Sequence, residues 1–361
     1  MIKILVVDDS LIFRKSIEKA LSKVDNIQII GSVWNGVKAL EFIKNIEIPN
    51  LITLDVEMPE MNGLQTLQEI QKINATLPKD KKIEVIMVSS LTRSGANETI
   101  QALQDGAFDF VTKPSNLDPE LALEELRKAL ESKIALLNGN YKASGNSSIN
   151  KIVAGNMSPK STSIKAIEVI AIGISTGGPK ALGDILPILC TLTDLPIIIV
   201  QHMPKEFTKS FADNLNKKCN HEVIEAEDNT KIKKKTVYIA PGGMHLCLRR
   251  NEMRDPIVVL SDNAPENNSK PSVDVLFRSL ADVYGNKAIA VVMTGMGNDG
   301  AKGVLPLFRA GAEIIAQDKD TSVVWGMPGS AVQTGCVAKV VALNKIPSII
   351  QQIINQRNQN A

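Results

Sequence analysis

Short apolar runs alternate with amphipathic stretches along most of this chain. In its first part the apolar runs have the length and composition of strands, and they occupy residues 4–7, 27–30, 51–54, 85–88 and 108–111. Residues 118–137 close the series with helical spacing, with Asp118 as the predicted cap and Pro119 at the first helical position. The pattern predicts a five-fold βα repeat in a domain that spans residues 1–138.

The composition changes after this domain. Residues 139–166 are rich in Asn, Ser, Gly and Lys, and they show little apolar periodicity, which is typical of a flexible linker. Strand-like runs then resume at 169–174, 197–200, 237–240, 257–260, 288–293 and 313–316. They predict a second α/β domain over residues 167–357, doubly wound around a mostly parallel sheet.

Composition narrows the classes of function. A chain of 361 residues exceeds what one hydrophobic core usually supports, so two domains are expected. The net charge of +2, without a basic stripe, disfavours nucleic acid as a partner. Four widely spaced cysteines form no disulfide-like framework, and no apolar run approaches membrane-spanning length. We expect a cytoplasmic protein without membrane insertion.

Acidic and basic residues gather at the strand ends of the first domain. Asp8 and Asp9 follow the first strand, Asp55 ends the third, Ser89 ends the fourth and Lys113 follows the fifth. The carboxyl ends of parallel strands share one edge of a sheet, and clustered carboxylates there suit Mg²⁺. Asp55 is then a candidate nucleophile toward phosphorus. Lys113 and Mg²⁺ would neutralise the phosphoryl charge, and the Ser89 hydroxyl could bind the acyl phosphate.

This pattern resembles the receiver domain of two-component response regulators. The motifs that carry the likeness are LVVDDS, LDVEMPEMNG, VSS and FVTKP. The resemblance implies a flavodoxin-like (βα)5 fold. It also implies that the backbone carbonyl of Glu57 joins Asp8, Asp9 and Asp55 as a metal ligand, and that Phe110 occupies the aromatic switch position.

Three polar signatures in the second domain each follow an apolar strand. The motifs GISTGGP (173–179), QHMP (201–204) and TGMGNDG (294–300) carry Ser175, His202 and Asp299. At one sheet edge these side chains could converge, and they are the groups that acyl transfer needs.

Further candidates for this site are oxyanion donors and the other histidines. Backbone N–H groups near Thr176 and Met296 are candidate oxyanion donors. Of the other two histidines, His221 lies in a polar stretch, and His245 is expected in a loop near a strand end, as a neighbour of the site.

The loop that carries Asp299 also has a competing interpretation. Gly295, Gly297 and Gly300 spell a dinucleotide-binding fingerprint, and acidic residues at 318 and 320 lie near the ribose-binding distance. An acid inside that loop would repel a pyrophosphate, which counts against a nicotinamide-dependent oxidoreductase. The order Ser, His, Asp along the chain also differs from the order of an α/β-hydrolase.

Nearly the whole chain resembles the CheB family, the chemotaxis response-regulator protein-glutamate methylesterases. Further matching motifs are YIAPGG, KPSVDVLF, TGMGNDGAKG and VVWGMPGSA, whereas Ile174 stands where the family more often has a small residue. The resemblance implies catalytic roles for Ser175, His202 and Asp299, with no cofactor in that domain.

The resemblance also implies a biological role. It predicts phosphorylation-activated hydrolysis of γ-glutamyl methyl esters on methyl-accepting chemoreceptors, deamidation of selected glutamines, and a chemotaxis histidine kinase as phosphodonor. The alternative is a response regulator whose second domain binds a nucleotide or partner without catalysis.

Overall fold

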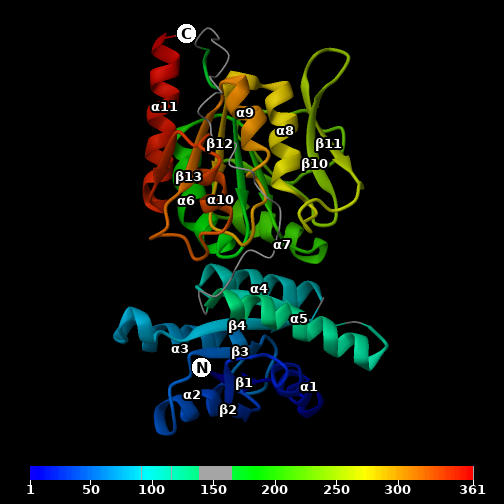
Figure 1. Ribbon diagram of the computed structural model, residues 1–361, viewed down its shortest axis with the longest axis vertical. Helices are drawn as coiled ribbons and strands as arrows, with labels where there is room; N and C mark the ends of the chain where they lie inside the picture. The colour runs from blue at the N-terminus through cyan, green and yellow to red at the C-terminus, as the bar shows by residue number, and fades with distance from the viewer. Residues whose placement is uncertain (91, 115, 138–164, 361) are drawn as a thin grey trace. The chain divides into compact units, whose positions relative to one another are not determined.

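The computed structural model describes residues 1–90, 92–114, 116–137 and 165–360. The chain divides into two compact units, Met1–Lys142 and Ala143–Ala361, which are drawn in blue to green and in green to red in Figure 1. The predicted linker, 139–166, falls almost entirely outside the described residues, so its character stays a prediction.

The first unit is a five-stranded parallel sheet with helices between successive strands. Its strands are β1 (Ile2–Val7), β2 (Ile27–Val33), β3 (Leu51–Asp55), β4 (Glu84–Ser89) and β5 (Asp109–Thr112). Its α-helices are α1 (Leu11–Leu21), α2 (Gly36–Asn45), α3 (Gly63–Thr76), α4 (Arg93–Gln104) and α5 (Pro119–Leu137). The predicted βα repeat is confirmed, and Asp118 caps α5 by accepting from the backbone N–H of Glu120 at 2.8 Å.

The strand order of this unit is β2-β1-β3-β4-β5, and every pairing is parallel. The direction of winding therefore reverses between β1 and β3. In open α/β sheets a crevice forms at that point, outside the carboxyl ends of the strands. Residues directly after β1 and at the end of β3 are thus placed together by the topology.

The second unit contains nine strands and six α-helices among its described residues. The strands are β6 (Val169–Ile174), β7 (Ile197–Gln201), β8 (Glu222–Glu225), β9 (Thr236–Ile239), β10 (His245–Arg250), β11 (Pro256–Ser261), β12 (Ala288–Val292), β13 (Glu313–Gln317) and β14 (Lys339–Val341). The helices are α6 (Gly178–Leu192), α7 (Lys205–Asn216), α8 (Val273–Val283), α9 (Val304–Ala310), α10 (Met327–Gln333) and α11 (Ile346–Asn360).

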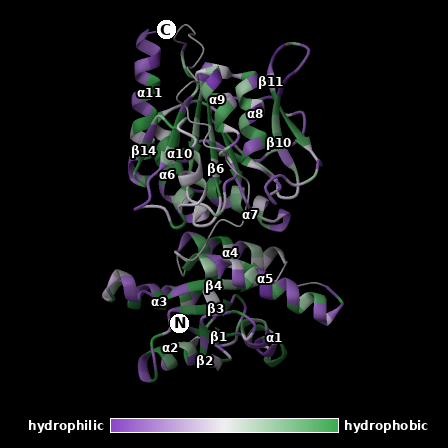
Figure 2. Cartoon of the chain, in the orientation of Figure 1, coloured by the Kyte–Doolittle hydropathy of each residue, from purple (hydrophilic) through white to green (hydrophobic). Residues whose placement is uncertain are grey.

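Seven of these strands form one parallel sheet in the order β14-β13-β12-β6-β7-β9-β8. Winding starts at β6 and proceeds to β7 on one side, whereas β12 lies on the other side. Every residue of β6, β7 and β12 is buried, because helices cover both faces of the sheet. Figure 2 shows this hydrophobic centre in green around β6.

Residues 257–260 form a strand as predicted, but this strand lies outside the main parallel sheet. They belong to β11, which pairs antiparallel with β10 in a separate two-stranded sheet at one flank of the unit (Figure 1). A short apolar run does not encode the direction of its partner. His245 likewise begins β10 instead of lying in the predicted loop.

Helices pack on both faces of the large sheet. On one face, α8, α9 and α10 and the β10–β11 hairpin share a hydrophobic core with alternate residues of the central strands. Elsewhere in the unit, α6 packs against α7 and α11. Throughout the described part of the chain, each helix is too short or too polar to cross a membrane.

Candidate active site

The predicted catalytic residues lie at the carboxyl ends of three adjacent central strands. Ser175 follows β6, His202 follows β7, and Asp299 lies in the loop after β12. The winding reverses between β6 and β12, so this edge is where a ligand crevice is expected.

His202 and Asp299 are in direct contact. The Nε2 atom of His202 lies 2.8 Å from Oδ2 of Asp299, and the His202 side chain keeps 16% of its surface exposed. Burial works to raise the pKa of Asp299, but the His202 hydrogen bond and the N–H groups of Val273 and Asp274 outweigh it and lower the pKa. The carboxylate is therefore ionised and receives the Nε2–H, which leaves Nδ1 of His202 as an acceptor.

Ser175 lies in the sharp turn between β6 and α6. Its N–H donates to Thr294 O at 2.9 Å, and Gly177 takes a left-handed conformation with φ +78° at the start of α6. Gly178 is required in this turn because a Cβ there would collide with Oε1 of Gln201. Within the described residues, no hydrogen bond joins Ser175 Oγ to His202. The Ser175 Oγ can change between staggered rotamers about χ1, and such bonds often form only when substrate binds.

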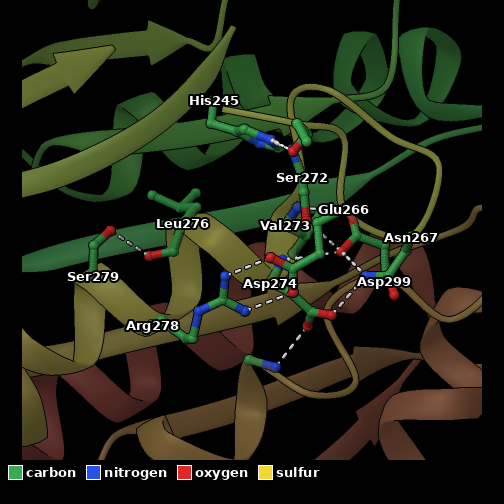
Figure 3. A network of polar contacts seen from close by, with 12 residues as sticks. His245, Glu266, Asn267, Ser272, Val273, Asp274, Leu276, Arg278, Ser279 and Asp299 are labelled. Carbon is green, nitrogen blue, oxygen red and sulfur yellow. Dashed lines mark hydrogen bonds and ion pairs between the residues drawn. The ribbon is translucent and has the colours of Figure 1, made fainter. Parts of the chain in front are cut away.

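Asp299 is held by the N-terminus of α8. Its Oδ2 accepts from Val273 N at 2.7 Å, and its Oδ1 accepts from Ser272 Oγ at 2.8 Å, Asp274 N at 3.0 Å and Gly300 N at 3.1 Å (Figure 3). Free N–H groups and the helix dipole both favour an anion at this position. The helix therefore stabilises the charge that His202 faces.

The predicted oxyanion donors lie on either side of the nucleophile turn. Thr176 follows Ser175 directly, and its carbonyl accepts from Thr294 Oγ1 at 3.0 Å. Met296 follows Gly295, and its N–H has no acceptor among the described residues. Neither assignment is tested by these contacts, so both stay predictions.

The other two histidines do not contact the His202–Asp299 pair. His245 accepts from Ser272 N through Nδ1 at 3.2 Å, and its Nε2 donates to Ala264 O at 3.0 Å. His245 therefore positions Ser272, the residue at the start of α8 that donates to Asp299. His221 is buried, and its burial lowers its pKa.

The glycine loop after β12 packs closely against the turn that carries Ser175. A Cβ at Gly295 would lie 2.7 Å from Cβ of Ser175. Asp318, one of the acids that the dinucleotide interpretation needs, instead accepts from both the N–H and the hydroxyl of Thr321 in a local turn.

The acidic residues of the first unit converge as the sequence predicts. One carboxylate oxygen from each of Asp8, Asp9 and Asp55 lies within 4.8 Å of the others. Lys113 Nζ lies 2.8 Å from Asp55 Oδ2 and 2.9 Å from Asp8 Oδ2. Burial raises the pKa of Asp55 to about 7, with the charge of Asp8 adding to the effect and Lys113 opposing it.

These residues fit a divalent cation. Asp8 is fully buried, and its Oδ2 has an ion pair with Lys113 but no hydrogen-bond partner among the described residues. Three carboxylates this close repel one another, and the Lys113 ammonium offsets only part of their charge, so a divalent cation would stabilise the cluster. Hard oxygen donors of this kind match the ligands of Mg²⁺.

The remaining predicted receiver residues occupy less direct positions. Ser89 ends β4, and its hydroxyl donates to Ser90 O at 3.1 Å and to Gly95 O at 3.3 Å. Phe110 is buried in β5, whereas Glu57 is exposed two residues after β3. Their roles in phosphorylation and metal binding stay predictions.

Comparison with known proteins decides the family. A CheB methylesterase family model matches residues 170–350, and a response regulator receiver domain model matches residues 4–127. A protein-glutamate methylesterase/protein-glutamine glutaminase of Desulfotalea psychrophila is 40% identical over 362 residues, which cover 96% of each chain. This chain belongs to the CheB methylesterase family. The resemblance drawn from its motifs is confirmed.

Other CheB relatives agree over the same extent. A protein of the same name from Bacillus licheniformis is 42% identical over 363 residues, covering 97% of this chain and 98% of its own. The crystal structure of the Thermotoga maritima CheB methylesterase catalytic domain is 40% identical with a TM-score of 0.50. It covers 52% of this chain and 99% of that one.

Sequence reasoning missed polar side chains that support this CheB-type site. Gln201 donates from Nε2 to the carbonyls of Ser175 and His202, at 3.0 and 3.1 Å. Ser272 and Asn267 donate to Asp299 from the segment before α8. Gln201 could have been noticed because it directly precedes His202. The segment before α8 carries no pattern that indicates which carboxylate it would reach.

Proposed function

We propose that this chain is a phosphorylation-activated protein-glutamate methylesterase of bacterial chemotaxis adaptation. Its substrates are γ-glutamyl methyl esters on methyl-accepting chemoreceptors, and it also deamidates selected glutamines. The observation that carries the proposal is the 2.8 Å His202–Asp299 contact on the strands that flank β6, whose end bears Ser175. In this proposal, residues 1–138 form the receiver, 139–166 a cytoplasmic tether and 167–357 the catalytic domain.

Acylation begins with proton transfer from Ser175 Oγ to Nδ1 of His202 as the oxygen attacks the ester carbonyl. Asp299 holds the Nε2–H and stabilises the imidazolium that forms. N–H groups of Thr176 and Met296 bind the oxyanion, and preorganised donors of this kind supply a large share of the rate. The imidazolium then protonates the departing methoxide, so that methanol leaves and a glutamyl-enzyme remains.

Deacylation repeats the same transfers with water as the nucleophile. His202 takes a proton from water at Nδ1, the oxygen attacks the acyl carbon, and the proton returns to Ser175 as the free glutamate leaves. A glutamine side chain follows the same route with ammonia as the leaving group. One constellation therefore accounts for both the esterase and the glutaminase reaction.

The receiver carries the regulatory chemistry. Asp55 accepts a phosphoryl group from a chemotaxis histidine kinase, and Lys113 pairs with the charge that results. The carboxylates of Asp8, Asp9 and Asp55 and the carbonyl of Glu57 would hold Mg²⁺. When bound, the ion neutralises phosphoryl oxygens during transfer. The Ser89 hydroxyl rotates to hydrogen-bond the acyl phosphate. Phe110 then transmits this conformational change to the surface of the domain.

Activation follows from the added charge. Phosphorylation places about −2 on Asp55, and in this proposal the added charge relieves an inhibition that unphosphorylated residues 1–138 exert on the esterase reaction. Removing residues 1–138 should therefore raise the rate of the unphosphorylated enzyme. If the truncated protein is no faster than the unphosphorylated full chain, the proposed inhibition is wrong.

The decisive test is demethylation of a methyl-labelled receptor fragment with and without acetyl phosphate. Wild type should release methanol faster with acetyl phosphate, and Asp55→Asn should keep only the unstimulated rate. Ser175→Ala should lose several orders of magnitude under both conditions. Near-wild-type turnover by Ser175→Ala would refute the catalytic assignment. A folded wild-type protein that releases no methanol would favour a non-catalytic output domain.

A further inference from the structure

A single asparagine bridges two buried carboxylates behind the His202–Asp299 pair. Nδ2 of Asn267 lies 2.8 Å from Oδ2 of Asp274 and 3.0 Å from Oδ1 of Asp299 (Figure 3). An amide nitrogen carries two hydrogens, so one can be donated to each acid. Asp274 is fully buried and Asp299 is 2% exposed. Among the described residues Oδ2 of Asp274 has only the Asn267 amide as a donor, so losing it would be costly, whereas Oδ1 of Asp299 has further donors.

The loop that carries Asn267 is fixed to α8. Glu266 and Ser269 exchange backbone hydrogen bonds around the turn, and Asn267 has the left-handed φ of +52° that asparagine tolerates well. The carboxylate of Glu266 accepts from both Nη atoms of Arg278 on α8, at 2.8 and 2.6 Å. The amide is therefore held against the same helix whose N-terminus receives Asp299.

The two oxygens of Asp299 have different partners. Oδ2 faces His202 and Val273 N, whereas Oδ1 is held by the donors of the α8 start, of Gly300 and of Asn267. The donors on Oδ1 set the rotation of the carboxylate, and that rotation aims Oδ2 at His202. Only two of these donors on Oδ1, Ser272 Oγ and Asn267 Nδ2, belong to side chains.

Asp274 makes the bridge necessary. Burial raises the pKa of Asp274 to about 6, and the charge of Asp299 adds to this effect. The N–H of Gly303 and the amide of Asn267 act in the opposite direction. Two anions packed together repel, and a donor shared between them offsets that repulsion. Without this shared hydrogen-bond donor, one of the two carboxylates would become protonated or the two side chains would rotate away from each other.

We propose that Asn267 is a positioning residue for the esterase reaction. It fixes the rotation of the Asp299 carboxylate against Asp274, so that Oδ2 holds the Nε2–H of His202 and Nδ1 remains the base for Ser175. This inference rests on the proposed hydrolysis and adds a residue to its machinery.

The matched experiment compares Asn267→Gly with Asn268→Gly in the full chain. Asn268 is the next residue, it also has a left-handed φ of +60°, and its exposed side chain has no hydrogen bond among the described residues. Glycine accepts this conformation without strain, so both variants keep the backbone. Asn267→Gly should lower kcat about 10- to 100-fold with KM within about twofold, the range for losing a hydrogen bond to a charged group. Asn268→Gly should match wild type.

A pH profile separates positioning from a general loss of order. The charged and titratable groups around Asn267 are Asp274, Asp299, His202, Glu266 and Arg278, with His245 behind Ser272 and Lys302 facing Glu266. Loss of the amide leaves the carboxylates less screened, so protons on this cluster are held to higher pH. The acid limb of kcat/KM should move upward by at least half a pH unit in Asn267→Gly. It should move further in Asn267→Asp, which keeps the shape but places another carboxylate between Asp274 and Asp299.

A third measurement does not depend on turnover. The Nε2–H of His202 should give a low-field proton resonance in wild type and in Asn268→Gly, and that resonance should be lost or shifted in Asn267→Gly. The inference is overturned if Asn267→Gly matches Asn268→Gly in kcat, pH profile and resonance while Ser175→Ala is inactive. If Ser175→Ala itself remains active, the proposed function fails first, and the resonance alone then decides the positioning.

Discussion

His202 donates its Nε2–H to Oδ2 of Asp299 across 2.8 Å, and the same carboxylate closes the N-terminus of α8. The ionised form of Asp299 is thus stabilised by the N-terminus of α8 as well as by His202, because several N–H groups point at the carboxylate. With Nε2 engaged in this way, Nδ1 is the ring nitrogen that the proposed mechanism leaves to accept the Ser175 proton.

Replacing Asp299 with Asn should disrupt its hydrogen bond with His202 while keeping nearly the same side-chain volume. The amide can present its NH2 to Nε2, which stabilises the wrong tautomer of His202 and leaves Nδ1 protonated. We expect kcat for methanol release to fall about 10³- to 10⁴-fold, as for other triads treated in this way. A loss below tenfold, in a variant with native circular dichroism, would show that the contact is structural.

Gly295→Ala should displace Ser175 through a steric clash. The new Cβ would press on Cβ of Ser175 and on the sulfur of Met327, so the serine turn must shift. We expect kcat to fall by at least tenfold, because small misplacements of reacting groups are costly.

Gly297→Ala in the same loop is the control for Gly295→Ala. Its Cβ would meet nothing within 4 Å, but its φ of +82° makes alanine strained. This variant should lose about 1 kcal/mol of stability and keep most of its activity. Equal kcat values for the two variants would show that crowding of Ser175 is not the cause.

The buried Asp274 should make the stability of the second unit fall as pH rises. Its pKa is about 6 in the folded protein and 3.8 without burial, so the native state binds more protons between those values. Stability then declines from pH 4 to 6 and levels off above, by as much as about 3 kcal/mol for this group. Asp274→Asn should remove that part of the decline.

Tryptophan fluorescence can isolate the second unit for this measurement. The chain has two tryptophans, Trp34 in the first unit and Trp325 in the second, and Trp34 is half exposed. In a Trp34→Phe background, urea unfolding of wild type and Asp274→Asn at pH 4.5 and 7 reports on Trp325 alone. Parallel pH dependence in the two proteins would contradict the assignment.

Lys113→Met should strengthen Mg²⁺ binding while abolishing the response to acetyl phosphate. Lys113 Nζ pairs with Asp8 and Asp55, so it competes with a metal for their oxygens and also supplies charge to the phosphorylated state. Titration calorimetry at pH 8 should show Mg²⁺ bound several-fold more tightly than in wild type. Lys133→Met, which breaks the 2.7 Å pair with Asp109 in the same domain, should change neither quantity. Weaker Mg²⁺ binding in Lys113→Met would contradict competition.

Much of this architecture follows from the sequence because βα alternation leaves few topologies. Asp8, Asp55 and Lys113 meet, and so do His202 and Asp299, since strand ends in one parallel sheet share an edge. The β10–β11 hairpin could not be predicted, because a short apolar run gives no pairing direction. Edge strands β8 and β14 carry charged residues and hence lack an apolar signal. The bridge made by Asn267 depends on loop conformation, which local pattern does not encode.

The sheet order places β12, β6 and β7 side by side, with β13 and β14 beyond them on one margin and β9 and β8 on the other. Backbone opening in folded proteins begins at rims and rarely reaches such interior strands before global unfolding. Ser175, His202 and Asp299 are therefore anchored where amide exchange should be slowest. Local opening of the outer strands would leave the positions of these three residues unchanged.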